Sequence, residues 1–205
     1  MARVVYLIRH AAPVGWRTRR FIGHLDAHLS DDGERQAREL AARLAAVRLT
    51  AIYTSDLSRT RRTAEIVAEP HGLVPIVRPE LREFAMGDWD GLTADEIRAR
   101  DPARFDQWMA TVGEFQFPGG ENVTQVAARV WPAFERIAGA HAEGRVAVVA
   151  HGGSNRAILC RVLGLPLARI LSLGQDYAAV SVLERQREGW RMTSLNDAPP
   201  HQSRD

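Results

Sequence analysis

Alternation of short apolar runs with amphipathic segments constrains the fold of this chain more than any other feature. Each run has only four to seven residues and is rich in β-branched and apolar side chains, which is typical of a buried strand. Apolar residues recur at helical spacing after each run. Strands that alternate with helices favour a parallel sheet covered on both faces. The predicted strands are 3–9, 51–54 and 145–150, and the predicted helices that follow them are 31–48, 58–68 and 154–163.

The other segments fit the same α/β architecture, a three-layer αβα sandwich with a mostly parallel central sheet. Further predicted elements are a strand at 74–78, helical pieces at 93–100 and 102–112, a helix at 123–137 and a hairpin within 178–195. Residues 80–121 are the least regular part of the chain. Because no linker or repeat divides the sequence, we expect one domain, 1–205, in which 80–121 form a small helical insertion, or lid.

Polar side chains follow several of the predicted strands. Arg9 and His10 end the first strand, and His151 directly follows the strand at 145–150. Arg59 lies just beyond the second strand, and Glu83 follows the strand at 74–78. Ligands of parallel α/β sheets bind outside the carboxyl ends of the strands. We therefore expect these residues to meet at one edge of the sheet, although they are far apart in sequence.

Such a group of side chains suits phosphoryl transfer. That reaction spreads negative charge over the equatorial phosphoryl oxygens, and catalysis is mostly positioning and electrostatic stabilisation. Arginine grips phosphate oxygens with a planar fork that stays charged. A neutral imidazole can attack phosphorus, and neighbouring arginines favour the neutral form. A carboxylic acid can protonate the departing alkoxide, which contributes about 10²–10⁴-fold to the rate.

Composition excludes several other classes of protein. No apolar run approaches the roughly 20 residues that span a membrane, and the apolar N-terminus lacks a signal-peptide cleavage site. The single cysteine, Cys160, cannot form a disulfide within the chain, in agreement with a reducing compartment. A net charge of +2 gives little support for a nucleic-acid partner. We expect a cytoplasmic protein without a membrane or nucleic-acid partner.

The motifs of the chain resemble those of the histidine phosphatase superfamily, in its phosphoglycerate-mutase-like branch. Arg9-His10-Ala11 is similar to the Arg-His-Gly signature of that family. The similar blocks span nearly the whole chain in the order of the family. They continue with Arg20-Phe21-Ile22-Gly23, Leu29-Ser30, Gly33, Gln36-Ala37, Thr54-Ser55-Asp56-Leu57-Ser58-Arg59, Thr63-Ala64-Glu65, Leu81-Arg82-Glu83, Gly87-Asp88-Trp89-Asp90-Gly91-Leu92-Thr93, Pro118-Gly119-Gly120-Glu121, His151-Gly152-Gly153 and Trp190 to Leu195-Asn196.

The resemblance implies a role for each strand-end residue. His10 would be the nucleophile that is phosphorylated. Arg9, Arg59 and His151 would hold the phosphoryl oxygens. Glu83 would be the general acid and then the base that activates water. The resemblance implies neither a metal nor another cofactor.

Further substrate contacts are implied at Ile22, Gly23, Gly152 and Trp16. Gly23 stands where the family offers a backbone N–H to the substrate. Trp16 stands where the family has a polar residue that contacts phosphate, and Ala11 stands where glycine is usual. Both are departures from the family pattern. We expect the methyl group of Ala11 to be tolerated and Trp16 to reshape the leaving-group pocket.

The expected function is hydrolysis of a small phosphorylated metabolite through a phosphohistidine, by a monomer or homodimer. The motifs around Trp89, Trp108 and Phe117 most resemble α-ribazole phosphatases, so α-ribazole 5′-phosphate is a candidate substrate. Trp16, Phe84, Trp89, Trp108 and Phe115 are candidates to line an apolar leaving-group pocket. Packing of the lid against the core is the alternative for each of them, and for any single one it is favoured. A cofactor-dependent phosphoglycerate mutase is the alternative, but Glu121 follows Thr93 by 28 residues (121 − 93), a shorter insertion than mutases carry.

Three further alternatives remain open from the residues. His24, Asp26 and His28 alternate as metal ligands of a metallohydrolase would on an extended segment. His151-Gly152-Gly153 is similar to an oxyanion motif of esterases, although no Gly-x-Ser-x-Gly nucleophile elbow accompanies it. A non-catalytic binding protein that keeps the fold would usually lose part of the charged set, which is complete here.

Overall fold

A computed structural model of the chain describes residues 3–141 and 143–198. Within these residues the core is one six-stranded sheet, whose first four strands run parallel. The last two strands form an antiparallel hairpin at one edge. In spatial order the strands are β3 (Ile76–Val77), β2 (Ala51–Thr54), β4 (Arg145–Ala150), β1 (Val4–Arg9), β5 (Val180–Arg185) and β6 (Trp190–Asp197).

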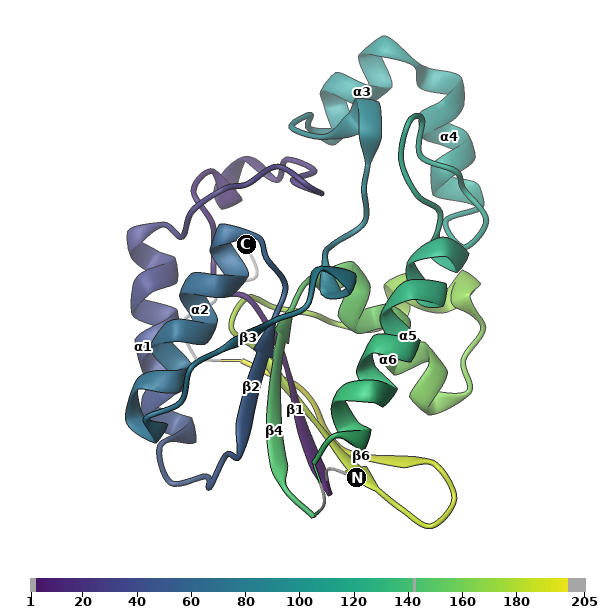
Figure 1. The fold of residues 1–205 in the computed structure, drawn as a ribbon. Coiled ribbons are helices and arrows are strands. Elements are labelled where there is room, and N and C mark those ends of the chain that lie inside the picture. Colours follow the sequence, from purple (N-terminus) through teal and green to yellow (C-terminus); the bar gives the residue numbers. More distant parts are fainter. Residues whose placement is uncertain (1–2, 142, 199–205) are drawn as a thin grey trace.

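Helices cover both faces of the sheet, which confirms the three-layer αβα architecture (Figure 1). The helices α1 (Asp31–Leu44) and α2 (Ser58–Ala68) lie on one face, and α5 (Val123–Gly139) and α6 (Gly152–Leu163) lie on the other. The short helices α3 (Ala94–Arg100) and α4 (Pro102–Ala110) stand beyond the sheet, at the top of the view. Single turns of 3₁₀-helix occupy 16–18, 69–71, 79–81 and 87–89, and a longer one occupies 167–172.

Alternation along the central strand β1 produces two separate cores. Val5 and Leu7 pack with the helices α5 and α6, where Phe134 is completely buried. Ile8 belongs to the other cluster, which includes Leu40 of α1 and residues of α2. Successive side chains of a strand point to opposite faces, so a strand inside a three-layer sandwich must be apolar on both. This is why the sequence of β1 is a continuous apolar run.

Several element boundaries differ from the sequence prediction. The helix predicted to reach residue 48 ends at Leu44, because tight turns follow in which Val47 N–H donates to Leu44 O. Val47 still packs on the core, so its apolar spacing was wrongly read as helix. The strand predicted at 74–78 is reduced to Ile76–Val77, a partly exposed edge strand. The helix predicted from residue 154 begins earlier, at Gly152.

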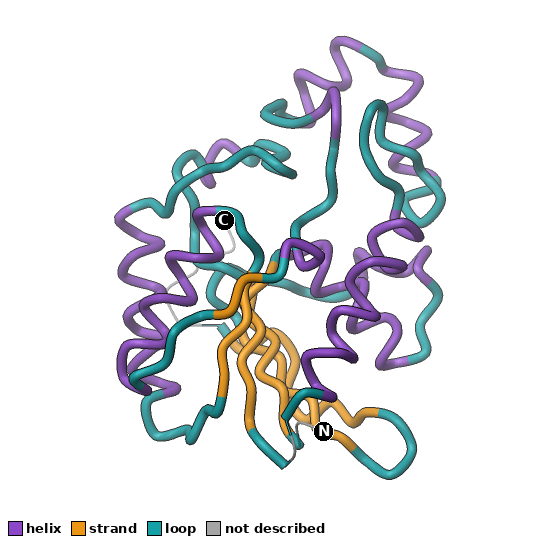
Figure 2. The backbone as a smooth tube through the Cα atoms, in the orientation of Figure 1, coloured by secondary structure: helices purple, strands orange, loops and turns teal. Residues whose placement is uncertain are grey.

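Residues 80–121 pack against the loop that follows β1. Phe21 of this loop exchanges backbone hydrogen bonds with Gly91 and Leu92, at 2.6 and 2.9 Å. Its ring lies 5.4 Å from the ring of Trp108, and Arg20 pairs with Glu96. Figure 2 shows these loops facing each other above the ends of the orange strands. In the described part of the chain, no helix is both long and apolar enough to cross a membrane.

Candidate active site

The register of two parallel strands brings the two candidate histidines together. Strands β1 and β4 are neighbours, and Arg9 pairs with Ala150. The next residue of each strand is therefore His10 or His151, and His10 N–H donates to Ala150 O at 3.0 Å. The two imidazole rings lie 5.1 Å apart and both residues are buried. The sequence prediction that these histidines share one pocket is consistent with this geometry.

Hydrogen bonding orients the His10 ring. Its Nδ1 lies 2.8 Å from the carbonyl oxygen of Ala11, and a carbonyl can only accept, so Nδ1 carries the proton. In the neutral ring, Nε2 then holds the lone pair. Burial, followed by the charges of Arg59 and Arg9, holds the pKa of His10 well below its ordinary value of 6.5. The ring is therefore neutral at neutral pH and has its nucleophilic nitrogen available.

Two arginines approach the His10 ring without a carboxylate partner. Arg59 is 1% exposed and donates to the carbonyl oxygens of Gly23 and Leu25, at 2.7 and 2.6 Å. Arg9 donates to Gln175 O and stacks on the ring of Tyr177. The Nε atoms of both arginines are buried and have no hydrogen-bond partner among the described residues. Buried cations of this kind are costly unless an anion pairs with them, so the geometry suits an anionic ligand.

His151 directly precedes the helix α6, and its ring lies beside that of His10. Its Nε2 is 2.8 Å from Ser55 Oγ, while its buried Nδ1 has no partner within the described part of the chain. Burial and the nearby Arg59 lower the pKa of His151 well below 6.5. The second imidazole is therefore also neutral at neutral pH, and it contributes a polar atom rather than a charge.

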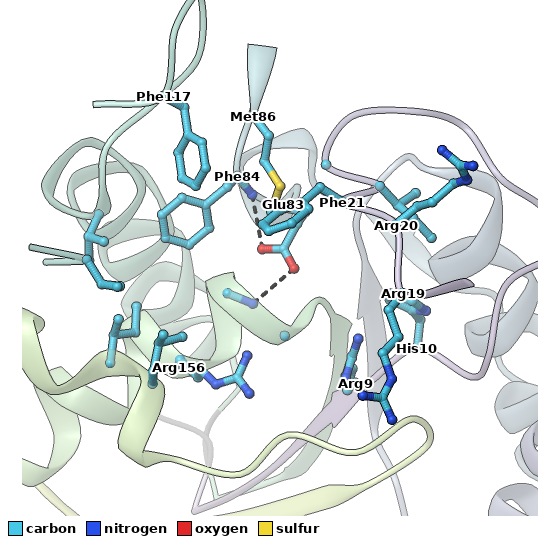
Figure 3. Close-up of a pocket in the computed structure, with 18 of the residues that line it drawn as sticks. Arg9, His10, Arg19, Arg20, Phe21, Glu83, Phe84, Met86, Phe117 and Arg156 are labelled. Atoms are coloured by element: carbon cyan, nitrogen blue, oxygen red, sulfur yellow. Dashed lines mark hydrogen bonds between the residues drawn. The ribbon is translucent and has the colours of Figure 1, made fainter. Parts of the chain in front are cut away.

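Glu83 reaches the same pocket from the other side of the sheet edge (Figure 3). Its carboxylate accepts hydrogen bonds from the backbone N–H groups of Gly153, Ser154 and Phe84, at 2.9, 3.2 and 3.0 Å. Gly153 and Ser154 are in the first turn of α6, where N–H groups have no partner within the helix. A carboxylate at this helix end is favourable, which explains why Glu83 points inward.

Arg129 of α5 holds the backbone that carries Glu83. It donates to the carbonyl oxygens of Glu80, Arg82 and Glu83 at 2.6–2.8 Å. It also pairs with Glu121 at 2.7 Å, and Glu121 in turn accepts from Ala85 N–H. The Gly-Gly-Glu motif at 119–121 therefore supports the segment of Glu83 from outside the pocket. The sequence pattern alone did not single out Arg129.

A cavity of about 280 Å³ lies over these groups. Arg9, His10, Arg59 and Glu83 all line it. Figure 3 shows Arg9 and His10 below the Glu83 carboxylate. One wall is apolar and includes Phe84 and Trp108, as expected. In contrast, Trp89 and Phe115 pack inside the insertion, with ring centroids 5.1 Å apart, and do not line the cavity. Further lining residues are Arg19, Arg20, Phe21, Ile22, Gly23, Met86, Val112, Phe117, Val123, Gly152, Gly153, Arg156, Ile170, Leu171 and Tyr177.

Several of these lining residues were not singled out by the sequence analysis, and Arg156 and Tyr177 are the polar ones nearest the His10 motif in structure. Arg156 lies one helical turn after Gly152 on α6, so helical periodicity from the His151 motif gives a usable signal. Tyr177 lies in the loop before β5, with its ring 5.6 Å from that of His10. No sequence signal places Tyr177 here, because its position depends on β5 pairing with β1.

Two residues of the alternating His24-x-Asp26-x-His28 motif, on which the metallohydrolase alternative depends, have separate hydrogen-bond partners. His24 Nε2 lies 2.9 Å from Glu83 O, whereas Asp26 accepts from the N–H and hydroxyl of Ser58, at 2.6 and 2.8 Å. Asp26 thereby caps the first turn of α2. In the ranges 3–141 and 143–198, no three His, Cys, Asp or Glu side chains gather as a metal-binding group. His24, Asp26 and His28 therefore do not form the ligand set that the metallohydrolase alternative requires.

The family model of the histidine phosphatase superfamily (branch 1) matches residues 5–198. The chain belongs to the histidine phosphatase superfamily. Among curated members, phosphoserine phosphatase 1 of Hydrogenobacter thermophilus is 34% identical over 93% of this chain and 90% of its own. A probable phosphoglycerate mutase of Photorhabdus laumondii is 33% identical over 91% of this chain and 86% of its own.

Solved structures of two proteins named as phosphatases have the same fold. A mycobacterial glucosyl-3-phosphoglycerate phosphatase, solved with VO₃, has a TM-score of 0.87 and 33% identity, over 96% of this chain and 100% of its own. The α-ribazole phosphatase of Shigella flexneri has a TM-score of 0.87 over 95% and 96%, with 23% identity. Because that identity is low, the similarity to the Shigella flexneri structure supports a shared fold only.

Two positions depart from the histidine phosphatase pattern. Ala11 is buried, its methyl group packs in the core beside α1 and α2, and its N–H donates to Thr63 Oγ1 at 3.1 Å. Trp16 is not among the lining residues of the cavity. Its ring lies 6.0 Å from that of Tyr177, which lines the cavity. Trp16 therefore neighbours a lining residue, and the structure gives it no direct place at the leaving group.

Proposed function

We propose that the protein hydrolyses phosphoric monoesters through a phosphohistidine at His10. The observation that carries the proposal is the state of the His10 ring, which is neutral and has its proton on Nδ1. Beside it lie Arg9 and Arg59, whose buried Nε atoms have no hydrogen-bond partner among the described residues. That arrangement offers a nucleophile and a cradle for negative charge in one place. Membership of the histidine phosphatase superfamily and relatives named as phosphatases support it.

The first step follows from the positions of His10 and Glu83. His10 Nε2 attacks phosphorus while the bond between phosphorus and the ester oxygen breaks. Glu83, in its protonated form, gives its proton to that departing oxygen, and an alcohol leaves. Arg9 and Arg59 balance the charge on the phosphoryl oxygens. His151 is proposed to assist from beside the His10 ring, with its buried Nδ1, which has no partner among the described residues, as the contact atom.

The second step restores the enzyme. Glu83, now a carboxylate, takes a proton from water, and the water oxygen attacks phosphorus as the P–N bond breaks. Inorganic phosphate leaves, and His10 regains its neutral ring with the lone pair on Nε2. The backbone contacts of Glu83 with α6 keep the carboxylate at the side of the cavity in both steps.

Trapping of the intermediate tests the proposal. Rapid quenching with ³²P-labelled substrate should give a phosphoenzyme that is labile in acid and stable in base, as a phosphoramidate is. His10→Ala should abolish both the adduct and turnover. His141→Ala is the matched control, because His141 contacts Tyr53 far from the cavity. An acid-stable adduct, or turnover by His10→Ala above a few per cent of wild type, would contradict the assignment.

The substrate is proposed to be a small phosphorylated metabolite, with α-ribazole 5′-phosphate as a candidate. The apolar wall of Phe84, Phe117 and Trp108 supports an apolar leaving group of this kind. A phosphoglycerate mutase is the second candidate, because several relatives carry that name. Product analysis separates the two: a phosphatase releases inorganic phosphate, whereas a mutase converts 3-phosphoglycerate into 2-phosphoglycerate. A protein that does neither and only binds phosphomonoesters would support the non-catalytic alternative.

We further propose that the chain is a single domain and that 80–121 act as its lid. The segment borders the cavity through Phe84, Met86 and Trp108 and contacts the loop at 19–23. Closure over a bound phosphate analogue would slow the exchange of its backbone N–H groups. Hydrogen exchange with and without orthovanadate tests this, and unchanged exchange across 80–121 would argue against a lid.

A further inference from the structure

The His151 ring begins a chain of buried hydroxyl groups. Its Nε2 lies 2.8 Å from Ser55 Oγ, and Ser55 Oγ lies 2.6 Å from Thr60 Oγ1. Thr60 Oγ1 is in turn 2.7 Å from the carbonyl oxygen of Leu57. His151, Ser55 and Thr60 are all completely buried, so water does not reach them and each of their protons needs an acceptor within the protein.

The carbonyl group at the end of this chain sets the direction of its hydrogen bonds. Leu57 O can only accept, so Thr60 Oγ1 donates to it. Because a hydroxyl has a single proton, Thr60 Oγ1 must accept from Ser55 Oγ, and Ser55 Oγ must then accept from His151 Nε2. The reverse direction would leave Thr60 Oγ1 and Leu57 O, two acceptors, 2.7 Å apart without a proton between them.

The two imidazoles of the site therefore carry their protons on different nitrogens. His10 has its proton on Nδ1, which donates to Ala11 O, whereas His151 has its proton on Nε2. In the neutral His151 ring the lone pair is then on Nδ1, which is buried and has no partner in the described part of the chain. The two rings are 5.1 Å apart, so a hydrogen-bond acceptor lies beside the nucleophile.

An acceptor at this position favours one protonation state of the ligand. A phosphoryl oxygen without a proton is itself an acceptor, so it would be repelled by the lone pair of His151 Nδ1. A phosphoryl oxygen that carries a proton can donate to the same atom. Phosphate monoesters lose their second proton at a pH of about 6, so both forms are present near neutral pH.

The groups around His151 keep that proton on the ligand. Burial, followed by the charge of Arg59, lowers the pKa of His151 well below 6.5. The charged and titratable groups that face it are Arg9 and His10 at the end of β1, Arg59 of α2, Arg129 of α5, and Glu83, which accepts from the N–H groups of the first turn of α6. The arginines among them oppose a second proton on the ring, and a proton between the ring and the ligand therefore belongs to the phosphoryl oxygen.

We propose that Ser55 and Thr60 are positioning residues that keep His151 Nδ1 as an acceptor, so that the site binds a phosphate monoester in its singly protonated form. The P–OH group of the ester donates to His151 Nδ1, while Arg9 and Arg59 bind the oxygens that carry charge. The inference rests on the proposed phosphatase function and adds the protonation state of the bound substrate to it. No covalent bond changes when the ester binds in this way.

The positions of the ring protons can be measured directly. In ¹⁵N-histidine-labelled enzyme, two-bond ¹H–¹⁵N correlation spectra distinguish a ring protonated on Nδ1 from one protonated on Nε2. His10→Gln and His151→Gln spectra assign the two rings. Wild type should show His10 protonated on Nδ1 and His151 protonated on Nε2. A His151 ring protonated on Nδ1 would overturn the inference.

Thr60→Val should change the His151 ring without contacting it. Valine removes the acceptor of the Ser55 proton, which then turns to His151 Nε2 and leaves the ring proton on Nδ1. Thr60→Ser is the matched control, because it keeps the hydroxyl group and should keep the wild-type spectrum. A merely structural role of Thr60 would alter stability in both variants and would not move the ring proton. An unchanged His151 spectrum in folded Thr60→Val would contradict the relay of hydrogen bonds.

A matched pair of inhibitors tests the protonation state of the ligand. Benzylphosphonate and its α,α-difluoro analogue have similar shapes, and fluorine lowers the second pKa of the phosphonate. At one pH above both of these values, wild type should bind benzylphosphonate more tightly, by about tenfold for each unit of difference in pKa. The ratio of the two Ki values should fall toward one in Thr60→Val and be kept in Thr60→Ser. Glu83 has the same protonation state in both measurements and does not affect the ratio.

The outcomes separate this inference from the proposed function. A trapped phosphohistidine tests the function alone. If it forms but wild type binds the difluoro analogue as tightly as benzylphosphonate, the inference is wrong and the function stands. If the inhibitor ratio and the ring protons are as expected but no phosphohistidine forms, the function is wrong and the hydrogen-bond relay stands. If Thr60→Val does not fold, Ser55→Ala replaces it, and a Ki ratio equal to that of wild type in this variant would also overturn the inference.

Discussion

Adding one methyl group at Gly153 should displace the proposed general acid, Glu83, while leaving its carboxyl group chemically unchanged. Gly153 lies in the first turn of α6, and its N–H donates to Glu83 Oε2 at 2.9 Å. A Cβ there would lie 2.4 Å from Glu83 Oε1 and 2.3 Å from Phe84 Cδ2. Carbon atoms in ordinary contact are about 3.5–4.0 Å apart, so the ring and carboxylate must move by about 1 Å or more.

The size of the effect follows from that displacement. Phe84 is only 6% exposed, so its ring cannot swing into solvent, and overpacking should cost about 1–3 kcal/mol of stability. A catalytic group that is misplaced by about 1 Å can lose roughly 10²-fold in rate. We expect Gly153→Ala to lower kcat/KM on alkyl phosphates by about 100-fold, or about 2.7 kcal/mol. The loss on p-nitrophenyl phosphate should be smaller, because that leaving group needs little protonation.

Steady-state kinetics on both substrates, with the thermal midpoint and far-UV circular dichroism of each variant, checks this prediction. Gly139→Ala is the matched control, because it adds the same methyl group at the end of α5, where nothing lies within 4 Å. It should keep full activity and gain up to about 1 kcal/mol of stability. A folded Gly153→Ala variant within about threefold of wild type on alkyl phosphates would refute the reasoning, since an effect of that size is under 1 kcal/mol.

Three other predictions concern the same site. Glu83→Gln should lower kcat on alkyl phosphates by about 10²–10⁴-fold and spare p-nitrophenyl phosphate, and equal losses on both would argue against Glu83 as the acid. The pKa values of the buried His10 and His151 lie well below 6.5, so below pH 6.5 the unfolded chain takes up protons at these rings and the folded chain does not. The free energy of unfolding should therefore decrease as the pH falls below 6.5. Urea unfolding from about pH 6.5 to 5 should show a slope of up to about 1.4 kcal/mol per pH unit for each histidine, smaller in His10→Gln, and a flat profile would contradict it. Tyr177→Leu removes the ring that lies 3.8 Å from the Arg9 guanidinium and should weaken inhibition by orthovanadate about 3- to 10-fold, whereas Tyr177→Phe should not.

The architecture was largely predictable because burial on both faces leaves a clear trace in the sequence. The continuous apolar runs of β1 and β4 predicted inner strands, and Ser30 predicted the start of α1, where its Oγ accepts from Gly33 N–H at 3.1 Å. The ends of elements were less predictable. Val47 has the sequence spacing of a core-facing helical residue but lies in a turn. The spacing indicates only that the side chain points into the core and does not distinguish the last turn of a helix from the turn that follows it.

The candidate site was predictable to the extent that it depends on strand ends. His10 and His151 directly follow parallel strands, and parallel strands end at the same edge of the sheet. Trp16, in contrast, does not directly follow a strand of the sheet. It lies in a loop, and its ring neighbours that of Tyr177, which is far away in sequence. Its position in the family pattern therefore did not show that it lies outside the cavity lining.

Local patterning of side chains was enough to establish the layers of the fold, the edge of the sheet that carries the chemistry and the kinds of group that meet there. Folding of distant segments against each other added the rest: the neighbouring positions of β1 and β4, the Arg59 charge that helps to lower the pKa of His10, and the approach of Arg156 to Arg9. The difference has a physical origin. Periodic burial is written into each short segment, whereas strand order, loop paths and pairs of polar atoms depend on residues more than a hundred positions apart, as in the contact of Arg9 with Gln175.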